Sequence, residues 1–501
     1  MAKKGNFSKA MGGSKDAAAS RAAVYAVVLA TLILFYLIVK ASSLGIEMQA
    51  ASAIFLLAVA GIYIQRSFSF SGGFGLYAAS TKRGIGCIKR LARNRASLWE
   101  AMAEWGLVLG FGVLAYWLTG GKINKRVYAI GLASLVLMLL VVVPFLGMSI
   151  QFLNVPQISA RLQVQQSSPL PSGASAAEYL IYAATTITGF TGYMIVALWY
   201  NGLLILASVV KVATTGSLVS LASQTPGVVP LIPGITIPLL AGVAALVILM
   251  VIHEFSHGVL ARIAKVRIKA IGLLVYGIIP IGAFVEPEEK EISKLDRMRQ
   301  TRIFSAGFSA NFLATVFFFA ALYLLIQYMP GHVYAQHVVI TGTLKGFPAY
   351  GVIRNGSQIL YWNGFKISNM SSFQYAAKND SPGSLVNITT NLGTYSLIAK
   401  APPDTAGYNQ SKGLVGVEIG EVNQPVNNGL FTKFMIFLYA LVGLSFLLNF
   451  AIAVLNLLPL PMFDGWRIYK ANIKSNRFTN LMAALIVLGL LLNVLPWFAI
   501  L

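Results

Sequence analysis

The sequence predicts a mainly α-helical, polytopic transmembrane bundle of about nine spans, with a small β-rich domain inserted between two of them. Charged residues are 11% of the 501 residues and hydrophobic residues are 57%, whereas a typical soluble protein has about 25% charged residues. So few charges cannot cover a fold of this size in water, so lipid must cover much of it. A fully soluble protein is therefore excluded.

Nine apolar stretches supply the predicted spans. They are residues 22–42, 48–65, 100–120, 127–149, 179–209, 234–257, 303–327, 432–456 and 478–500. The fifth is long enough to be tilted, broken or double. A basic segment precedes the first span, which is typical of a retained signal anchor. The single cysteine, Cys87, excludes an intramolecular disulfide.

The net charge of +22 would suggest a nucleic-acid partner for a soluble protein. With the N-terminus in the cytoplasm, however, 26 of the 38 basic residues fall on segments that the nine-span plan places inside: 1–21, 66–99, 150–178, 258–302 and 466–477. The excess therefore indicates membrane orientation, and no nucleic-acid partner is predicted. One turn, with Lys122, Lys125 and Arg126, falls outside and violates the rule locally.

Residues 331–430 differ from the rest because apolar and polar residues alternate there between Gly, Pro and Asn turn signals. The pattern predicts a small domain of short strands, placed outside the cell membrane by the charge plan. Five Asn-x-Ser/Thr triplets agree with that side, at Asn355, Asn369, Asn379, Asn387 and Asn409. The alternative is that a polar, Asn-rich domain collects such triplets by chance.

The sixth span ends in His253-Glu254-Phe255-Ser256-His257. Positions i and i+4 share one face of a helix, so both imidazoles can reach one metal ion, with Glu254 close enough to take a proton from water. Ionisable groups at membrane depth are costly and usually functional. The alternative is a helix end capped at the water interface, but capping does not require two histidines at ligand spacing.

A catalytic zinc needs three protein ligands and one open position. His332 and His337 lie at the entrance to the outside domain and are interpreted as ordinary histidines. Asp464 follows two helix-breaking prolines where the eighth span ends inside, at the same predicted depth as the end of the sixth. We therefore predict a Zn²⁺ site formed by His253, His257 and Asp464.

With these motifs the chain resembles the site-2 proteases, zinc metalloproteases that cut transmembrane helices. The resemblance rests on the His253–His257 motif, on Asn456-x-x-Pro459-x-Pro461-x-x-Asp464-Gly465, on the stretch 277–287 and on residues 305–311. Phe308 stands where proline is common in the family. The resemblance covers roughly 230–500 and is closest to archaeal members.

The resemblance also implies a domain plan. Residues 1–225 form an N-terminal membrane region of unassigned role with about five spans, and 226–330 and 431–501 form the two parts of the protease core. Residues 331–430 form a PDZ-like domain that binds peptides or substrate ectodomains by strand addition. Residues 271–285 are apolar and broken by Pro280, so a further span is possible there, but it would separate the two metal motifs. A membrane-dipped β-hairpin is therefore preferred, and its edge could hold extended substrate.

The predicted function is hydrolysis of peptide bonds within the transmembrane segments of other membrane proteins, with Glu254 as general base, as in regulated intramembrane proteolysis. Asn311 and Asn456 are candidates for orienting the substrate, or else make interhelical hydrogen bonds. The alternatives are a metal-ion transporter or sensor, which predicts more ionisable residues along the spans than the sequence has, and an inactive scaffold, against which the intact Glu254 argues.

Overall fold

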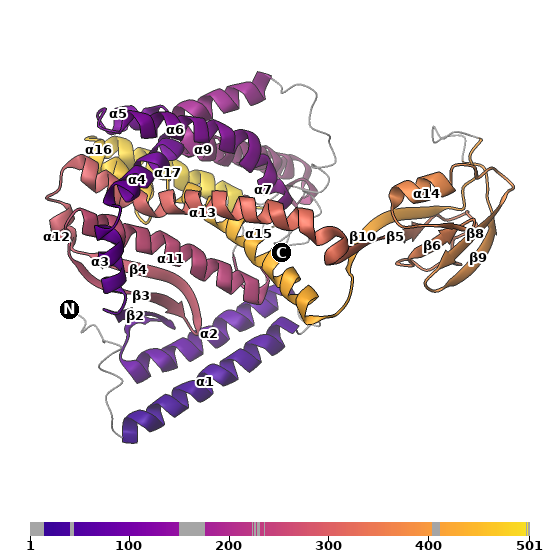
Figure 1. Ribbon diagram of the computed structural model, residues 1–501, viewed down its shortest axis with the longest axis horizontal. Helices are drawn as coiled ribbons and strands as arrows, with labels where there is room; N and C mark the ends of the chain where they lie inside the picture. Colours follow the sequence, from indigo (N-terminus) through magenta and orange to yellow (C-terminus); the bar gives the residue numbers. More distant parts are fainter. Residues whose placement is uncertain are drawn as a thin grey trace. The chain divides into compact units, whose positions relative to one another are not determined.

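The computed structural model describes residues 15–40, 45–149, 176–222, 224, 227, 231–234, 236–402, 411–496 and 498. The chain divides into two compact units, unit 1 (Met1–Leu322 with Ala440–Leu501) and unit 2 (Tyr323–Tyr439). It passes from the first to the second within α13 (Arg297–His332) and returns within α15 (Leu430–Leu455). The fold is mainly helical with small antiparallel sheets, as predicted (Figure 1).

Unit 1 is built mostly of helices. Besides α13 and α15 they are α1 (Lys15–Lys40), α2 (Ile46–Phe68), α3 (Ile85–Arg93), α4 (Ala96–Phe111), α5 (Leu114–Leu118), α6 (Lys125–Leu137), the π-helical turn η1 (Met138–Val142), α7 (Val143–Ser149), α9 (Ala176–Thr215), α10 (Val219–Ala222), α11 (Leu239–Ile263), α12 (Glu289–Ile292), α16 (Asp464–Asn472) and α17 (Asn476–Val494).

Seven of the described helical stretches are long and apolar enough to cross a membrane, which indicates a multi-pass membrane protein. They are Ala51–Phe68, Lys125–Leu146, Tyr182–Thr215, Leu239–Ile263, Arg297–His332, Leu430–Leu455 and Asn476–Val494. The predicted span at 22–42 corresponds to a shorter apolar stretch of α1, Ala22–Ile38.

The predicted span at 100–120 is not one helix. α4 ends at Phe111, and Gly112 adopts a φ of 57°, a left-handed conformation that stops a helix. A Cβ on Gly112 would lie 2.3 Å from the carbonyl oxygen of Thr186, so the break lets the backbone of α9 approach closely. Hydropathy detected the apolar composition of this segment but not the backbone turn within it.

The fifth predicted span is broken, one of the three possibilities that its length allowed. Gly189 interrupts α9 with φ 67° and ψ −167°, and its α-carbon faces the end of α4, where a Cβ would lie 2.3 Å from the carbonyl carbon of Gly110. Thr191 donates a hydrogen bond of 2.7 Å to the Gly110 carbonyl. Paired glycine breaks therefore join α4 and α9 backbone to backbone.

A four-stranded sheet lies beside α11 in the order β1 (Ser71–Gly73), β2 (Leu76–Thr81), β3 (Ile268–Tyr276), β4 (Ile279–Pro287). All its pairs are antiparallel, and β3 and β4 form a hairpin over the segment 271–285, turning at Gly277 with a φ of 64°. Among the residues that the structure describes, β4 is an end strand, so none of them pairs as a strand with its outer edge. β1 and β2 bring residues of the N-terminal region into the same sheet.

The turn before α6 lies beside the start of α13. The backbone N–H of Asn124 donates to Glu104 Oε2 over 2.8 Å, and Glu104 also forms an ion pair with Arg302. Lys122, Lys125 and Arg126 therefore lie at the same end of unit 1 as Arg302, a residue of the basic segment 258–302. The nine-span plan put this turn at the opposite end of the spans from that segment, whereas the structure brings the two together. The cause is the break at Gly112, because α4 and α5 are two separate helices there and do not form one continuous span.

The Glu104–Arg302 ion pair predicts a large stability effect. The Glu104 side chain is 3% exposed, and loss of one partner of a buried pair costs about 3–5 kcal/mol because the other charge stays buried. Glu104→Ala is therefore expected to lower the free energy of unfolding by about 3 kcal/mol. Glu100 pairs with the same arginine over 3.2 Å at 36% exposure, and Glu100→Ala is the matched control, expected to cost at most about 1 kcal/mol. Equal losses in denaturant unfolding would contradict this account.

Between the ends of α13 and α15, the described residues of unit 2 form two small antiparallel sheets and one short helix. β5 (Tyr334–Thr343) pairs with β10 (Val417–Pro425), and the second sheet has the order β7 (Phe365–Lys366), β6 (Ile359–Trp362), β8 (Leu385–Thr390), β9 (Gly393–Ile398). Asn369 caps α14 (Met370–Ala376) through a capping box. Buried aliphatic residues and Trp362 form the core of the unit.

Candidate metal centre

The helix α11 carries three of the predicted site residues at its C-terminal end. The helix begins at Leu239 in an apolar sequence and continues without a break through His253, Glu254 and His257 to Ile263. The helical repeat therefore places the two imidazoles on one face, and their ring centroids lie 4.9 Å apart.

Asp464 lies 207 residues after His257 in the sequence. The chain leaves α15 at Leu455, passes through the proline-containing segment and begins α16 at Asp464. The backbone N–H of Gly465 donates to the carbonyl of Asn456 over 2.7 Å, which closes this segment. A Cβ on Gly465 would lie 2.3 Å from the carbonyl oxygen of Leu457, so the glycine permits the tight return. The start of α16 thus presents Asp464 to α11.

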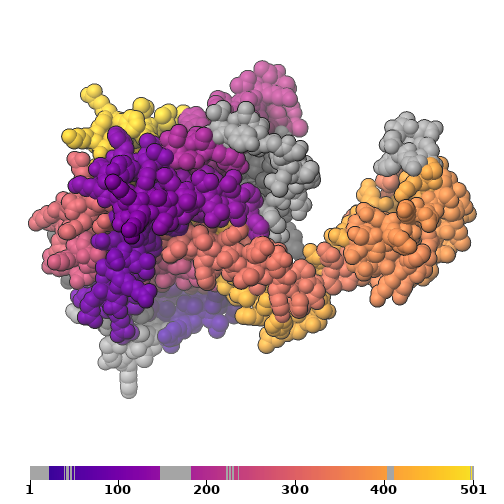
Figure 2. Space-filling view, turned by 45° about the horizontal axis from the view of Figure 1, so that its top comes forward, coloured from indigo at the N-terminus to yellow at the C-terminus, as the bar shows by residue number. Residues whose placement is uncertain are grey.

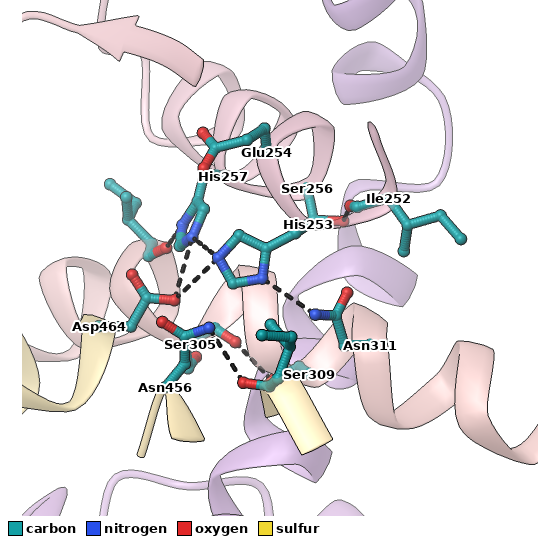
Figure 3. A network of polar contacts seen from close by, with 12 residues as sticks. Ile252, His253, Glu254, Ser256, His257, Ser305, Ser309, Asn311, Asn456 and Asp464 are labelled. Carbon is teal, nitrogen blue, oxygen red and sulfur yellow. Dashed lines mark hydrogen bonds and ion pairs between the residues drawn. The ribbon is translucent and has the colours of Figure 1, made fainter. Parts of the chain in front are cut away.

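The three side chains converge into a group that could hold a metal ion (Figure 3). Asp464 Oδ2 lies 3.3 Å from His253 Nε2 and 3.2 Å from His257 Nε2, and the two Nε2 atoms lie 3.3 Å apart. Ligands about 2.0–2.1 Å from a tetrahedral zinc are separated by about 3.3 Å. The donor triangle therefore has the size of one face of a zinc tetrahedron. Within the described ranges, no other group of three His, Cys, Asp or Glu residues could hold a metal ion.

The remaining ring nitrogen of each histidine has its own partner. His257 Nδ1 lies 2.7 Å from the Ile303 carbonyl oxygen on α13, so it carries the proton and leaves Nε2 free for a metal. His253 Nδ1 lies 3.1 Å from the Asn311 amide nitrogen. Asn311 Oδ1 is buried without a partner. A metal bound at His253 Nε2 requires that Nδ1 carry the proton. Rotating the Asn311 side-chain amide by 180° exchanges its nitrogen and oxygen, so that Oδ1 then accepts the hydrogen bond from Nδ1. The donor set thus fits zinc.

Asn311 is therefore expected to orient His253. Removing such a partner of a metal-bound histidine typically weakens metal binding tenfold to a hundredfold, so Asn311→Leu should weaken zinc binding by that factor. Asn311→Asp keeps an acceptor for the Nδ1 proton and should bind zinc as tightly as the wild type or more so. Competition with a chromophoric chelator measures both affinities. If the Asp and Leu variants lost affinity equally, this orientation of Asn311 would be wrong.

Gly307 on α13 faces the same donor atoms. A Cβ at this position would lie 2.4 Å from His253 Cε1, 2.4 Å from His257 Nε2 and 2.5 Å from His253 Nε2. Real Cβ atoms do not approach other atoms so closely. Glycine is therefore the residue that leaves the metal position open, and the pattern of the sequence alone did not single it out.

α4 holds α13 in the position that this geometry requires. The hydroxyls of Ser305 and Ser309 each lie 3.3 Å from the Ala103 carbonyl and share their hydrogens between it and carbonyls of α13 itself. Gly106 lies against Ser309 so closely that a Cβ there would clash. Ile303, Gly307 and Asn311 lie on the same stretch of α13. Part of the N-terminal region thus supports the metal centre from outside the segment that carries the motifs.

Asp464 is held as a carboxylate by protons on the two histidines, and a bound cation would take the place of those protons. Burial raises the pKa of the Asp464 carboxyl, but the adjacent His257 and His253 outweigh burial and hold it below its usual range. Glu254 Oε2 accepts a hydrogen bond of 3.0 Å from the backbone N–H of Val285 on β4. The Glu254 carboxylate thus points toward the edge of the sheet rather than into the donor triangle (Figure 3).

The other predicted residues do not belong to the group of three candidate ligands. Asn456 donates to the Ile452 carbonyl of its own helix over 3.0 Å, so its role toward a substrate stays a prediction. His332 Nδ1 lies 3.0 Å from the Tyr328 carbonyl oxygen, and His337 Nδ1 lies 2.6 Å from Gln358 Nε2. Both histidines belong to unit 2 and neither joins the ligand group.

Comparisons with known proteins agree with this centre. The model of a family described as "Peptidase family M50" matches residues 241–495, which include both motifs. A curated protein of Methanocaldococcus jannaschii, "Uncharacterized protein MJ0971", is 26% identical over 256 residues. That match covers 49% of this chain and 62% of the relative, so this chain spans less than two thirds of the relative's length.

Proposed function

The chain belongs to peptidase family M50, and on this premise we propose that it is a zinc metalloendopeptidase that hydrolyses peptide bonds within transmembrane segments of other membrane proteins. The observation that carries the proposal is the donor triangle of His253, His257 and Asp464. Its two histidines and the neighbouring Glu254 lie on α11, a helix apolar enough to span a membrane. Such a position gives the site access to bonds that soluble proteases do not reach.

Different residues of the chain perform different parts of the proposed hydrolysis. When bound, zinc supplies Lewis-acid polarisation of the scissile carbonyl and of a water molecule. The Glu254 carboxylate takes a proton from the attacking water, and that proton then passes to the leaving amine nitrogen. The imidazoles hold their Nδ1 protons against Ile303 and Asn311, which fixes the ring planes through the reaction.

Substrate binding is proposed at the free edge of β4. An extended peptide can pair with the backbone of an end strand, and β4 is both the end strand and the one that contacts Glu254. A substrate helix must unwind first, because its carbonyls are engaged and shielded within the helix. Glycine or proline in the substrate span is therefore expected to favour cleavage.

We also propose an orientation of the chain in the membrane and a class of binding partner. The N-terminus is placed in the cytoplasm and residues 331–430 outside it, supported by the distribution of basic residues. Asn355, Asn369, Asn379 and Asn387 are exposed in unit 2, whereas Asn409 lies outside the described residues. We propose a PDZ-like peptide-binding role for unit 2, for substrate ectodomains or other peptides.

The test uses the purified full chain in lipid vesicles with a panel of tagged single-span substrates. The wild type is expected to contain one zinc per chain and to release fragments cut inside the span, and Asp464→Ala is expected to lose both properties. Zinc-loaded wild type that cuts no member of the panel would count against a protease. Zinc entry into the vesicles without cleavage would instead support a transporter, and substrate capture without either would support a scaffold.

A further inference from the structure

Two adjoining cavities lie where α3 packs beside the C-terminal end of α11. Their volumes are about 610 and 550 Å³, within the size range of small-molecule sites. Gly86, Lys89 and Arg262 line both of them. Eight basic residues line one or both cavities: Lys82, Lys89, Arg90, Arg93, Arg262, Lys265, Arg267 and Lys269.

These cavities have a large excess of positive charge. Glu288 is the one acidic residue among the lining side chains, and it pairs with Lys269 over 3.0 Å. Arg267 is paired with Glu291. The other six basic side chains make no ion pair with an acid in the described part of the chain. An anion is therefore the ligand that this lining favours.

Arg262 gives a second, independent indication of a missing partner. Its Nη1 donates to the Val266 carbonyl over 2.9 Å, but its Nε is buried and has no hydrogen-bond acceptor. A buried donor without an acceptor is costly. An anion in the cavities that Arg262 lines would offset this cost by pairing with the charge of its guanidinium group.

The lining also contains aliphatic surface, which distinguishes a lipid from a soluble anion. Ile85, Ile263 and Ile268 lie among the basic residues of the two cavities. α3 buries Ile88 against Gly258 of α11 and lies on the surface of unit 1 (Figure 2). Its opposite face is basic, as in helices that lie at a membrane surface.

The position in the bilayer agrees with this reading. α11 is one of the seven candidate spans and ends at Ile263, next to the cavities. The end of a spanning helix is where phospholipid headgroups meet the protein, and basic pockets there bind anionic headgroups. The six unpaired basic residues thus lie at headgroup depth.

We propose that these cavities bind the headgroup of an anionic membrane phospholipid. Its phosphodiester lies among Lys89, Arg93 and Arg262, and its glycerol and upper acyl chains contact the neighbouring isoleucines. The lipid thereby joins α3 to the end of α11, where Arg262 lies five residues beyond His257. This site uses none of the metal-binding residues, so it stands whether or not the chain is a protease.

The test titrates the full chain in neutral detergent with phosphatidylglycerol or phosphatidylcholine and measures bound lipid by native mass spectrometry. The wild type is expected to prefer phosphatidylglycerol. Lys89→Gln/Arg93→Gln should bind it roughly thirtyfold more weakly, from the usual contribution of two basic residues near a headgroup. Lys125→Gln/Arg126→Gln removes the same charge from exposed residues at the same end of unit 1 and should change the affinity less than about threefold.

Several results would overturn the proposal. Equal affinity for the two lipids, or equal loss in the two double variants, would show charge attraction without a site. Displacement of phosphatidylglycerol by equimolar glycerol 3-phosphate would identify a soluble phosphate as the ligand, and displacement by an acidic peptide would identify a protein partner. Thermal unfolding checks that each variant is folded. Lys82→Gln/Arg90→Gln provides a second variant of the same exposed lining, with the same expected direction.

Discussion

Glu254→Gln is expected to lower the rate of peptide-bond cleavage by about a hundredfold to ten-thousandfold while zinc remains bound. General-base catalysis contributes about this much, and an amide cannot take a proton from water at neutral pH. Because the amide oxygen can still accept the N–H of Val285, the fold should be unchanged. The initial rate of fragment release and the zinc content per chain measure the two parts of this prediction.

The matched control is Glu289→Gln. Glu289 lies near the same end of unit 1 and is 80% exposed, with a loose contact of 3.7 Å to Arg467. We expect this variant to cleave at the wild-type rate. Cleavage by Glu254→Gln at the rate of the control would show that another group removes the proton.

Gly307→Ala is expected to abolish zinc binding and, with it, cleavage. The added methyl group would occupy the position between the two imidazoles, 2.4 Å from His257 Nε2. α13 cannot move aside easily, because Ser305 and Ser309 are bonded to α4. The loss of zinc affinity should exceed the tenfold to hundredfold typical of a lost hydrogen bond to a ligand. Equilibrium dialysis against buffered zinc measures it.

Gly202→Ala is the control for adding a methyl group to a membrane helix. Its Cβ would lie 3.4 Å from the Asn493 side chain, an ordinary contact distance. This variant should keep its zinc and its unfolding midpoint. Wild-type zinc affinity in Gly307→Ala would show that the metal lies elsewhere than between these rings.

The grouping of the candidate metal ligands could be predicted from sequence because much of their pattern is local. His253 and His257 share a helix face whatever surrounds the helix, and few other ionisable residues interrupt the spans. Asp464 needed one further step, the matched depth of two helix ends, and the structure brings it within 3.3 Å of both imidazoles. Hydrophobic periodicity and residue spacing are sufficient for such features.

The support of the site could not be predicted in this way. Gly307 matters because α13 crosses α11 at contact distance. The role of the Ile303 carbonyl cannot be predicted from the sequence, because every residue has a backbone carbonyl. Glu104 finds its partner 198 residues away. The break at Gly112 depends on the approach of α9. Each of these features depends on tertiary packing, which hydropathy and residue spacing do not reveal.

The most direct measurement titrates zinc into metal-free protein and follows cleavage of a single-span substrate, with the cut position read by mass spectrometry. The account predicts that activity rises with occupancy until one zinc is bound per chain, that the cut lies inside the span, and that Asp464→Ala shows neither saturable zinc binding nor cleavage. Full cleavage in excess chelator would contradict it. So would cuts confined to residues outside the span, or zinc binding in Asp464→Ala as tight as in the wild type.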